Sequence, residues 1–166
     1  MGQRIGIYPG TFDPITLGHA DIIRRGARLV DRLIIGVTTN ISKNPMFSAD
    51  ERMAMVRREV SSLGIANVEV VGFTGLVVDF AKEHGVTVLV RGVRNVGDVD
   101  YERQMAVMNR DLYPALDTVM LTPSPEYAHL SSSLVRELAG LGAPVEKLVP
   151  PPVISPLLAR FGRPAG

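Results

Sequence analysis

Two patterns of apolar and polar positions alternate along the chain. Short runs of β-branched and other apolar residues show no polar face, which is typical of strands that are buried on both sides. Longer segments between them carry apolar residues at helical spacing, which predicts amphipathic helices. The runs predict strands at residues 5–8, 32–39, 68–73, 86–90 and 117–121, and the periodic segments predict helices at residues 20–30, 48–63, 76–84, 98–112 and 131–141.

Capping and helix-breaking residues mark the ends of several predicted elements. Ser48 and Glu51 have the spacing of a capping box at the start of a helix. Three consecutive prolines at residues 150–152 predict a stop and a change of direction. We expect one or two last helical turns at residues 157–161 and a frayed tail over residues 162–166.

Strand and helix alternate five times, which predicts an α/β fold: a single-domain, Rossmann-like, open parallel sheet of five strands with helices on both faces. The 166 residues suit one domain, to which we assign residues 1–166. Ligands of open α/β sheets bind beyond the carboxyl ends of the strands. We expect a site at that edge, where predicted strands are followed by residues 10–19, Lys43, Arg91 with Arg94, and residues 127–133.

Composition and charge exclude several classes of function. A net charge of +1 gives no general attraction for nucleic acid or a membrane surface, and no apolar run approaches the roughly 20 residues that span a bilayer. The absence of cysteine excludes disulfides, thiolate catalysis and cysteine-based metal sites. The N-terminus shows no long apolar segment after a basic start, so we expect a cytoplasmic protein.

The segment from Tyr8 to His19 is a strand-to-helix connection in which His19 lies where the helix begins. A helix N-terminus presents unpaired N–H groups and a partial positive charge, which favours a phosphate group. The polar residues expected around it can all donate hydrogen bonds, and three are cations, so we expect a phosphate-bearing ligand. These donors are Thr11, Thr16, His19, Lys43, Arg91, Arg94 and the three serines at 131–133.

Several common catalytic motifs are absent. The chain has neither the Walker pattern G-x-x-x-x-G-K-[ST] nor G-x-G-x-x-G, which argues against a P-loop kinase and an ordinary dinucleotide-binding enzyme. It also lacks the nucleophile elbow G-x-S-x-G. We therefore expect direct attack at phosphorus, with the protein positioning the reactants and stabilising charge.

Two segments resemble signatures of the nucleotidylyltransferase superfamily. Residues 16–19, Thr-Leu-Gly-His, resemble the [TH]-x-G-H signature, and residues 131–136 resemble the serine-rich second signature. Finer detail resembles the phosphopantetheine adenylyltransferase family in order and spacing, from about Ile5 to Pro150. This detail lies in residues 9–14, Gly18-His19, Lys43 with Pro45-Met46-Phe47, residues 91–94 and residues 98–102.

The resemblance implies a reaction: ATP and 4′-phosphopantetheine give dephospho-coenzyme A and pyrophosphate, with Mg²⁺, as the penultimate step of coenzyme A synthesis. It also implies a homo-oligomer, typically a hexamer. It assigns His19 to the charge that develops on the α-phosphate, Lys43 and Arg91 to the acceptor phosphate, and Val77 to the pantetheine arm. The ATP contacts that it implies are Thr11 (also at the pantetheine phosphate), Phe12, His19, Gly92, Val93, Arg94, Glu102, Tyr127, Ala128, His129, Leu130, Ser131, Ser132 and Ser133.

Two departures from the family pattern leave the adenine environment open. Val99-Asp100 stands where the family often has phenylalanine-glutamate, and His129 stands where it often has an apolar aromatic residue. Asp13 can serve as a turn residue or a metal ligand; the Asp-Pro pair favours the turn, and the magnesium ligands stay unassigned. A stripe of Tyr101, Met105, Met108 and Leu112 fits either the core or a subunit interface.

Two rival functions remain to be separated by experiment. One is a nucleotidylyltransferase for nicotinamide mononucleotide or glycerol phosphate; those groups usually carry histidine where this chain has Thr16. The other is a non-catalytic nucleotide-binding regulator, against which His19, Lys43 and Arg91 together argue. In the favoured reaction the acceptor's own phosphate is the nucleophile, and it is ionised at neutral pH, so no general base is needed.

Overall fold

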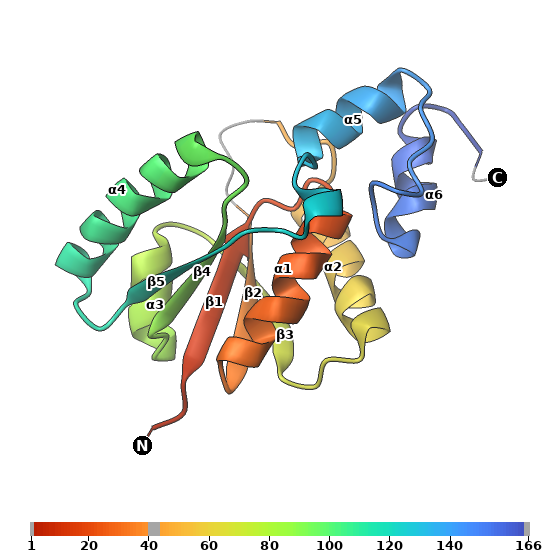
Figure 1. Cartoon of the computed structure of the whole chain (residues 1–166). Helices are drawn as coiled ribbons and strands as arrows, with labels where there is room; N and C mark the ends of the chain where they lie inside the picture. The colour runs from red at the N-terminus through yellow and green to blue at the C-terminus, as the bar shows by residue number, and fades with distance from the viewer. Residues whose placement is uncertain (1, 40–43, 165–166) are drawn as a thin grey trace.

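The computed structural model describes residues 2–39 and 44–164. Within them, five parallel strands form one sheet in the order β3-β2-β1-β4-β5 (Figure 1). The predicted α/β, Rossmann-like parallel sheet is therefore confirmed. The strands are β1 (Ile5–Gly10), β2 (Arg32–Thr38), β3 (Val68–Phe73), β4 (Val88–Gly92) and β5 (Asp117–Leu121).

Helices follow the strands and cover both faces of the sheet (Figure 1). The predicted capping box is confirmed: the Ser48 hydroxyl accepts from the Glu51 N–H, and the Glu51 carboxylate accepts from the Ser48 N–H. No helix in the described ranges is long and apolar enough to cross a membrane. The helices are α1 (Leu17–Gly26), α2 (Ala49–Leu63), α3 (Val77–His84), α4 (Val96–Leu112), α5 (Ser132–Gly140) and α6 (Pro151–Ala159), with 3-10 turns η1 (Ala27–Leu29) and η2 (Pro125–Tyr127).

The sheet separates two apolar cores, and neighbouring residues of β1 point into different ones. Tyr8 packs in the larger core with side chains of α1, α2 and α6. Ile7 packs in the smaller core, which α3 covers. Gly36 on β2 permits close packing there, because a Cβ at this position would lie 2.9 Å from Ile7 and 3.0 Å from Phe73. Burial on both faces explains why the strands show no polar side.

The fourth strand differs from its prediction in ways that matter for the site. The fourth strand was predicted at residues 86–90, but β4 runs to Gly92, so Arg91 belongs to the strand and not to a loop. Arg91 pairs in register with Met120 of β5, which extends the strand. Val86 instead donates its backbone N–H to the Ala81 carbonyl and so closes the C-terminal end of α3.

The C-terminal prediction was wrong about the prolines. Pro151 and Pro152 occupy the first turn of α6, where the N–H that proline lacks would have no partner within the helix. These prolines therefore start a helix. The predicted turns at residues 157–161 therefore cover only the end of a nine-residue helix. The expected fraying does not include Arg163, whose side chain donates to the carbonyls of Ala139 and Ala143.

Candidate active site

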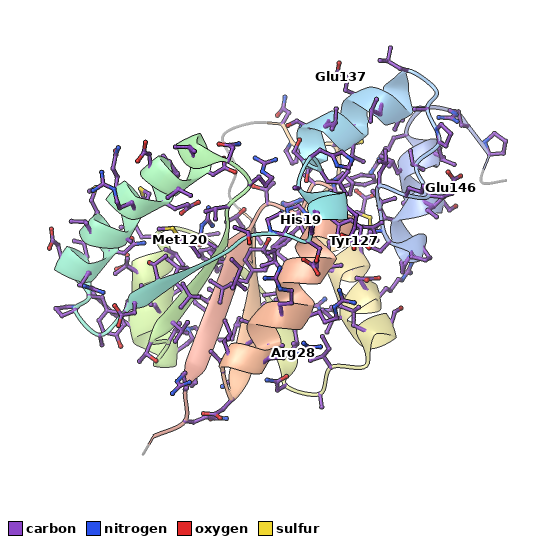
Figure 2. The ribbon with its side chains drawn as sticks, viewed as in Figure 1. His19, Arg28, Met120, Tyr127, Glu137 and Glu146 are labelled. Atoms are coloured by element: carbon purple, nitrogen blue, oxygen red, sulfur yellow. The ribbon has the colours of Figure 1, made fainter. Side chains whose placement is uncertain are left out.

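A cavity of about 680 Å³ opens at the carboxyl edge of the sheet, where the sequence predicts a site. We call it the main cavity; the ends of β1 and β4, the start of α1, helix α4 and the connection from Pro123 to Ser132 line it. Figure 2 places His19 and Tyr127 at this edge, whereas Arg28 in η1, which follows α1, lies at the opposite end of the sheet. The predicted site residues that line the cavity are Thr11, Phe12, His19, Val77, Arg91, Gly92, Arg94, Glu102, Tyr127, Leu130, Ser131 and Ser132.

Other predicted site residues are not among those lining the main cavity. Val93 is buried, and its backbone N–H donates to the Leu121 carbonyl. Ala128 and His129 lie beyond η2, with the His129 side chain exposed. Ser133 faces a smaller neighbouring cavity. Lys43 lies outside the described residues.

His19 is held by the first turn of α1. The Thr16 hydroxyl accepts from the His19 backbone N–H, and the Thr16 backbone N–H donates to His19 Nδ1 at 3.0 Å. A backbone N–H can only donate, so Nδ1 must be the unprotonated nitrogen and the neutral ring carries its proton on Nε2. The first turn of the helix therefore sets both the orientation and the tautomer of the ring.

Burial, and to a lesser degree the positive charge of Arg94, lower the pKa of His19 to about 4. Protonation of Nδ1 would also break the hydrogen bond from the Thr16 N–H. This bond therefore favours the neutral ring and lowers the pKa as well. His19 is therefore neutral at pH 7. It offers the cavity an N–H donor and no positive charge.

Aromatic rings support His19 from within the core. Phe12 packs edge-on against the His19 ring, with 5.1 Å between ring centroids, and Tyr8 packs edge-on against Phe12 at 5.5 Å. Phe12 has a φ of 51°, a left-handed backbone conformation that costs roughly 1–2 kcal/mol for a residue with a side chain. Gly10 leaves room for its ring, because a Cβ there would lie 3.0 Å from Phe12.

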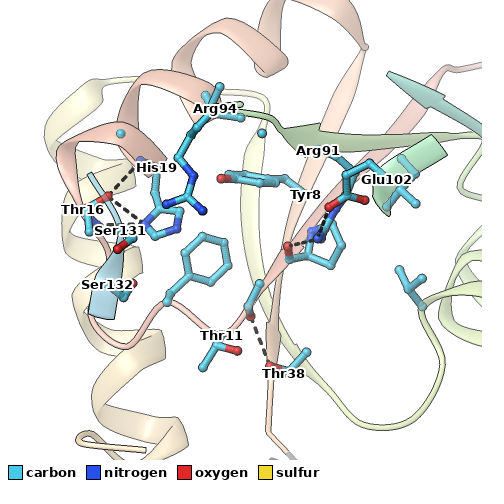
Figure 3. A pocket seen from close by; sticks show the side chains of 18 of the residues that line it. Tyr8, Thr11, Thr16, His19, Thr38, Arg91, Arg94, Glu102, Ser131 and Ser132 are labelled. Atoms are coloured by element: carbon cyan, nitrogen blue, oxygen red, sulfur yellow. Dashed lines mark hydrogen bonds and ion pairs between the residues drawn. The ribbon is translucent and has the colours of Figure 1, made fainter. Parts of the chain in front are cut away.

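Two arginines present their guanidinium groups to the main cavity (Figure 3). Arg91 Nη2 donates to the Glu102 carboxylate at 2.7 Å and Nη1 donates to the Pro9 carbonyl at 3.2 Å. Arg91 Nε is buried and has no partner in the described part of the chain. Arg94 pairs with Asp98 and donates to the Leu130 carbonyl. Glu102, predicted to contact ATP, thus orients Arg91 in the ligand-free structure.

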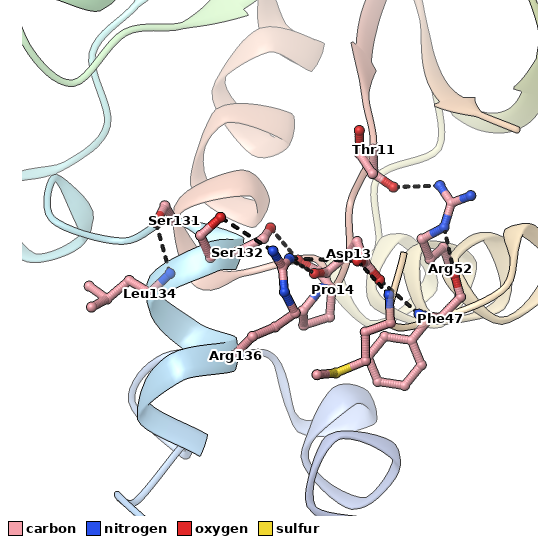
Figure 4. A network of polar contacts seen from close by, with 11 residues as sticks. Thr11, Asp13, Pro14, Phe47, Arg52, Ser131, Ser132, Leu134 and Arg136 are labelled. Carbon is pink, nitrogen blue, oxygen red and sulfur yellow. Dashed lines mark hydrogen bonds and ion pairs between the residues drawn. The ribbon is translucent and has the colours of Figure 1, made fainter. Parts of the chain in front are cut away.

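The serine turn joins α5 to the turn after β1. Ser131 caps α5 by accepting from the Leu134 N–H at 3.1 Å, as predicted for Ser131 or Ser132. Ser132 donates to the Pro14 carbonyl at 2.8 Å. Ser133 accepts from Arg136, which also donates to the Asp13 carbonyl (Figure 4). The second signature segment is therefore hydrogen-bonded to the turn that directly precedes the first.

Asp13 anchors the loop that precedes α2. Its carboxylate accepts from the backbone N–H groups of Met46 and Phe47 at 2.8 and 2.9 Å, and Arg136 lies 3.6 Å away. Both oxygens are thus engaged, in agreement with the turn role and not with a free metal ligand. In residues 2–39 and 44–164 no three His, Asp or Glu side chains gather in a way that could hold a metal ion.

Arg52 is a buried arginine that supports the site and that the sequence analysis missed. Its side chain is 1% exposed and donates to carbonyls of three segments: Thr11 after β1, Thr38 at the end of β2, and Phe47 (Figure 4). A signal was present in the sequence, since Arg52 stands at helical spacing on the face of the predicted helix that carries Met55, Val56 and Val60. Such a residue must find buried acceptors.

Asp21 was also missed. Its buried carboxylate accepts from the N–H and hydroxyl of Ser124 and from Arg24 and Arg25, so it ties the segment leading to Tyr127 onto α1. Burial raises the pKa of Asp21, but the hydrogen bonds from Ser124, Arg24 and Arg25 outweigh that effect and hold it below its usual range. The carboxylate therefore stays ionised.

Comparisons with known proteins agree with the signatures. A protein-family profile described as cytidylyltransferase-like matches residues 7–138. A phosphopantetheine adenylyltransferase of Sphingopyxis alaskensis is 54% identical over 159 residues, which are 96% of this chain and 94% of that protein. A protein of the same name from Thioalkalivibrio sulfidiphilus is 51% identical over 160 residues, or 96% of this chain and 99% of the other.

Solved structures share the fold at low sequence identity. A putative nicotinate-nucleotide adenylyltransferase from Vibrio parahaemolyticus superposes with a TM-score of 0.68 at 17% identity, covering 95% of this chain and 93% of that one. A lipopolysaccharide core biosynthesis protein from Thermoplasma volcanium superposes with a TM-score of 0.53 at 19% identity, over 74% and 98% of the two chains.

Proposed function

Because the chain belongs to the phosphopantetheine adenylyltransferase family, we propose that it transfers the adenylyl group of ATP to 4′-phosphopantetheine, giving dephospho-coenzyme A and pyrophosphate. The chain is a nucleotidyltransferase by this membership. One observation carries the mechanistic part: a neutral His19 and the guanidinium groups of Arg91 and Arg94 line one cavity beside a helix N-terminus. That set suits a polyphosphate substrate.

We assign His19 to the α-phosphate of ATP. In an in-line displacement, negative charge grows on the oxygens of the transferred phosphoryl group. A neutral imidazole whose Nε2–H is already oriented can donate a hydrogen bond to that charge without first reorganising. Its low pKa leaves the donor present throughout the neutral range.

We assign Arg91, with Lys43, to the phosphate of the acceptor. Arg91 is held by Glu102 and Pro9, and its charged side chain lines the main cavity, where it can meet a ligand oxygen. The acceptor phosphate attacks directly and needs no base, because it is already ionised at pH 7. Val77 lies at the start of α3 and lines the cavity, which supports its proposed contact with the pantetheine arm.

We assign the nucleotide to the segments that end β4 and begin α5. Gly92 and Arg94 line the main cavity on one side and Tyr127, Ser131 and Ser132 line it on another. Arg94 joins the two sides through its bond to the Leu130 carbonyl.

Mg²⁺ is proposed as a companion of ATP and not as a resident ion of the protein. Bound to the phosphates, it neutralises part of their charge. The engagement of both Asp13 oxygens by backbone N–H groups supports this assignment, since Asp13 is the carboxylate of the turn that carries His19. The arginines supply the remaining positive charge.

We also propose a homo-oligomer, a hexamer by family resemblance. Support comes from α4, where Tyr101, Met108 and Leu112 of the apolar stripe are more than half exposed and therefore do not belong to the core. Sedimentation of the purified protein tests this proposal, and a monomer at micromolar concentration would contradict it. The cytoplasmic location stays a prediction from the sequence.

The decisive experiment measures pyrophosphate release from Mg-ATP with each acceptor in turn. We expect release with 4′-phosphopantetheine only. Release only with nicotinamide mononucleotide or glycerol phosphate would assign the chain to another nucleotidylyltransferase. No release with any acceptor, together with tight ATP binding, would favour the non-catalytic regulator.

A further inference from the structure

Tyr8 is a buried polar side chain to which the proposed reaction assigns no role. It is 6% exposed and lines the main cavity. Its ring packs against Phe12 and lies 6.5 Å from the His19 ring, centroid to centroid. Its hydroxyl makes no hydrogen bond within the described residues, and no dashed line reaches it in Figure 3. A hydroxyl at a cavity wall without a protein partner can bond to a bound molecule.

The hydroxyl points toward the side of the cavity that holds Arg94 and His19 (Figure 3). The positive charges of Arg91 and Arg94 both act on it. The Gly92 backbone lies beside it, since a Cβ there would be in van der Waals contact with the Tyr8 oxygen at 3.7 Å. A ligand that follows the Gly92 backbone would therefore pass next to the hydroxyl.

The hydroxyl is a donor over the whole working pH range. Burial raises the pKa of Tyr8 well above its usual range, and this outweighs the opposite effect of Arg91 and Arg94. A neutral O–H beside two arginines does not repel an anion. It also adds a directional hydrogen bond to the charge attraction that the arginines supply.

We propose that Tyr8 is a further ligand-binding residue, whose hydroxyl donates a hydrogen bond to a phosphate oxygen of ATP held between His19 and Arg94. This inference rests on the proposed function for the identity of the nucleotide. It adds a donor from the interior of β1, whereas the resemblance in sequence implies contacts only from Thr11 and Phe12 in this part of the chain.

Tyr8→Phe tests the proposal, because it keeps the ring that packs on Phe12 and removes only the oxygen. Loss of a hydrogen bond to a charged group weakens binding by about 10- to 100-fold. We expect this rise in the dissociation constant for ATP and for inorganic tripolyphosphate in calorimetry, and a matching loss of kcat/KM for ATP. Tyr113→Phe is the control, since Tyr113 packs in the smaller core and is not among the residues that line the main cavity.

Thermal unfolding separates this role from a structural one. The hydroxyl has no partner in the ligand-free chain, so Tyr8→Phe should leave the melting temperature unchanged without ligand and reduce only the stabilisation that ATP adds. A lower melting temperature without ligand and unchanged ligand affinities would overturn the proposal.

The two probes also distinguish the part of ATP that is bound. A weaker ATP affinity with an unchanged tripolyphosphate affinity would move the contact to the ribose or base and overturn the proposed phosphate contact. If the wild-type protein transferred no adenylyl group to any acceptor, the proposed function would fail. The binding measurements would still decide the role of Tyr8.

Discussion

Arg52 and Arg91 lie at the same edge of the sheet, but their surroundings differ. The guanidinium of Arg52 is enclosed and donates to carbonyls of Thr11, Thr38 and Phe47. Arg91 has 29% of its side chain exposed in the main cavity, pairs with Glu102 and leaves its buried Nε without a partner in the described chain. The guanidinium of Arg52 is enclosed by the fold, whereas the side chain of Arg91 faces the main cavity.

The difference shows how a buried charge can be assigned to structure or to binding. Burial lowers the pKa of Arg52, an effect that Asp13 opposes, and the three carbonyls compensate the charge. Removing such a group should harm the fold. Removing Arg91 should instead harm the binding of an anion, because its partly exposed charge faces the main cavity.

The largest expected effect is that of Arg52→Met on stability. Three carbonyls lose their buried donor, and the segments that they belong to lose their connection, so the free energy of unfolding should fall by about 3–5 kcal/mol. Urea denaturation followed by circular dichroism measures this change. Arg57→Met, an exposed arginine of the same helix, is the control and should stay within about 0.5 kcal/mol of the wild type. A loss below about 1 kcal/mol for Arg52→Met would contradict the structural role that distinguishes Arg52 from Arg91.

The second effect concerns turnover. His19→Ala removes a donor oriented toward the transferred phosphate and should lower kcat by about 10²–10³-fold, or about 2.7–4 kcal/mol. Steady-state pyrophosphate release measures it. His84→Ala is a matched control, because His84 bonds to the Phe80 carbonyl and is not among the residues that line the main cavity. Near-native turnover of His19→Ala would show that the assignment of His19 is wrong.

A smaller effect is expected at Arg91. Arg91→Ala should raise the dissociation constant of 4′-phosphopantetheine by about 10- to 100-fold, or about 1.5–3 kcal/mol, and that of ATP much less. Arg91→Lys keeps a positive charge beside Glu102, so it serves as a second variant in case Arg91→Ala does not fold. Calorimetry with both ligands decides the point, and equal losses for the two ligands would count against an acceptor role.

The smallest effect is on the titration of His19. Burial is the larger cause of its low pKa and Arg94 the lesser, so Arg94→Met should move the midpoint upward from about 4 while leaving it below 6.5. The ring proton signals in NMR report this midpoint. An unchanged or lower midpoint would contradict the electrostatic role of Arg94.

The same pKa shift predicts how stability depends on pH. Between about pH 6.5 and 4 the unfolded chain binds a proton at His19 and the folded chain does not. The contribution of His19 to stability is therefore complete above pH 6.5 and is lost as the pH falls toward 4. Urea midpoints of the wild type and of His19→Gln at several pH values should differ in slope within this window.

Local patterns are enough to predict the sheet and the edge where the cavity lies. Apolar runs define the strands, and the turn after Tyr8 together with the serines at 131–133 marks the site. The pairing of Arg91 with Glu102 and the contacts of Arg52 were not predicted, because partners up to 41 residues apart meet only through tertiary packing. The start of α6 was missed because proline both ends helices and begins them.

The capping box at Thr16 and His19 has a consequence for the entropy of catalysis. A histidine stands where this motif usually has glutamate or glutamine, so the formation of α1 already immobilises the imidazole. The rotational freedom of the ring is lost once, during folding, and not again in each catalytic cycle. Binding energy from the substrates is then left for bringing the two phosphates together.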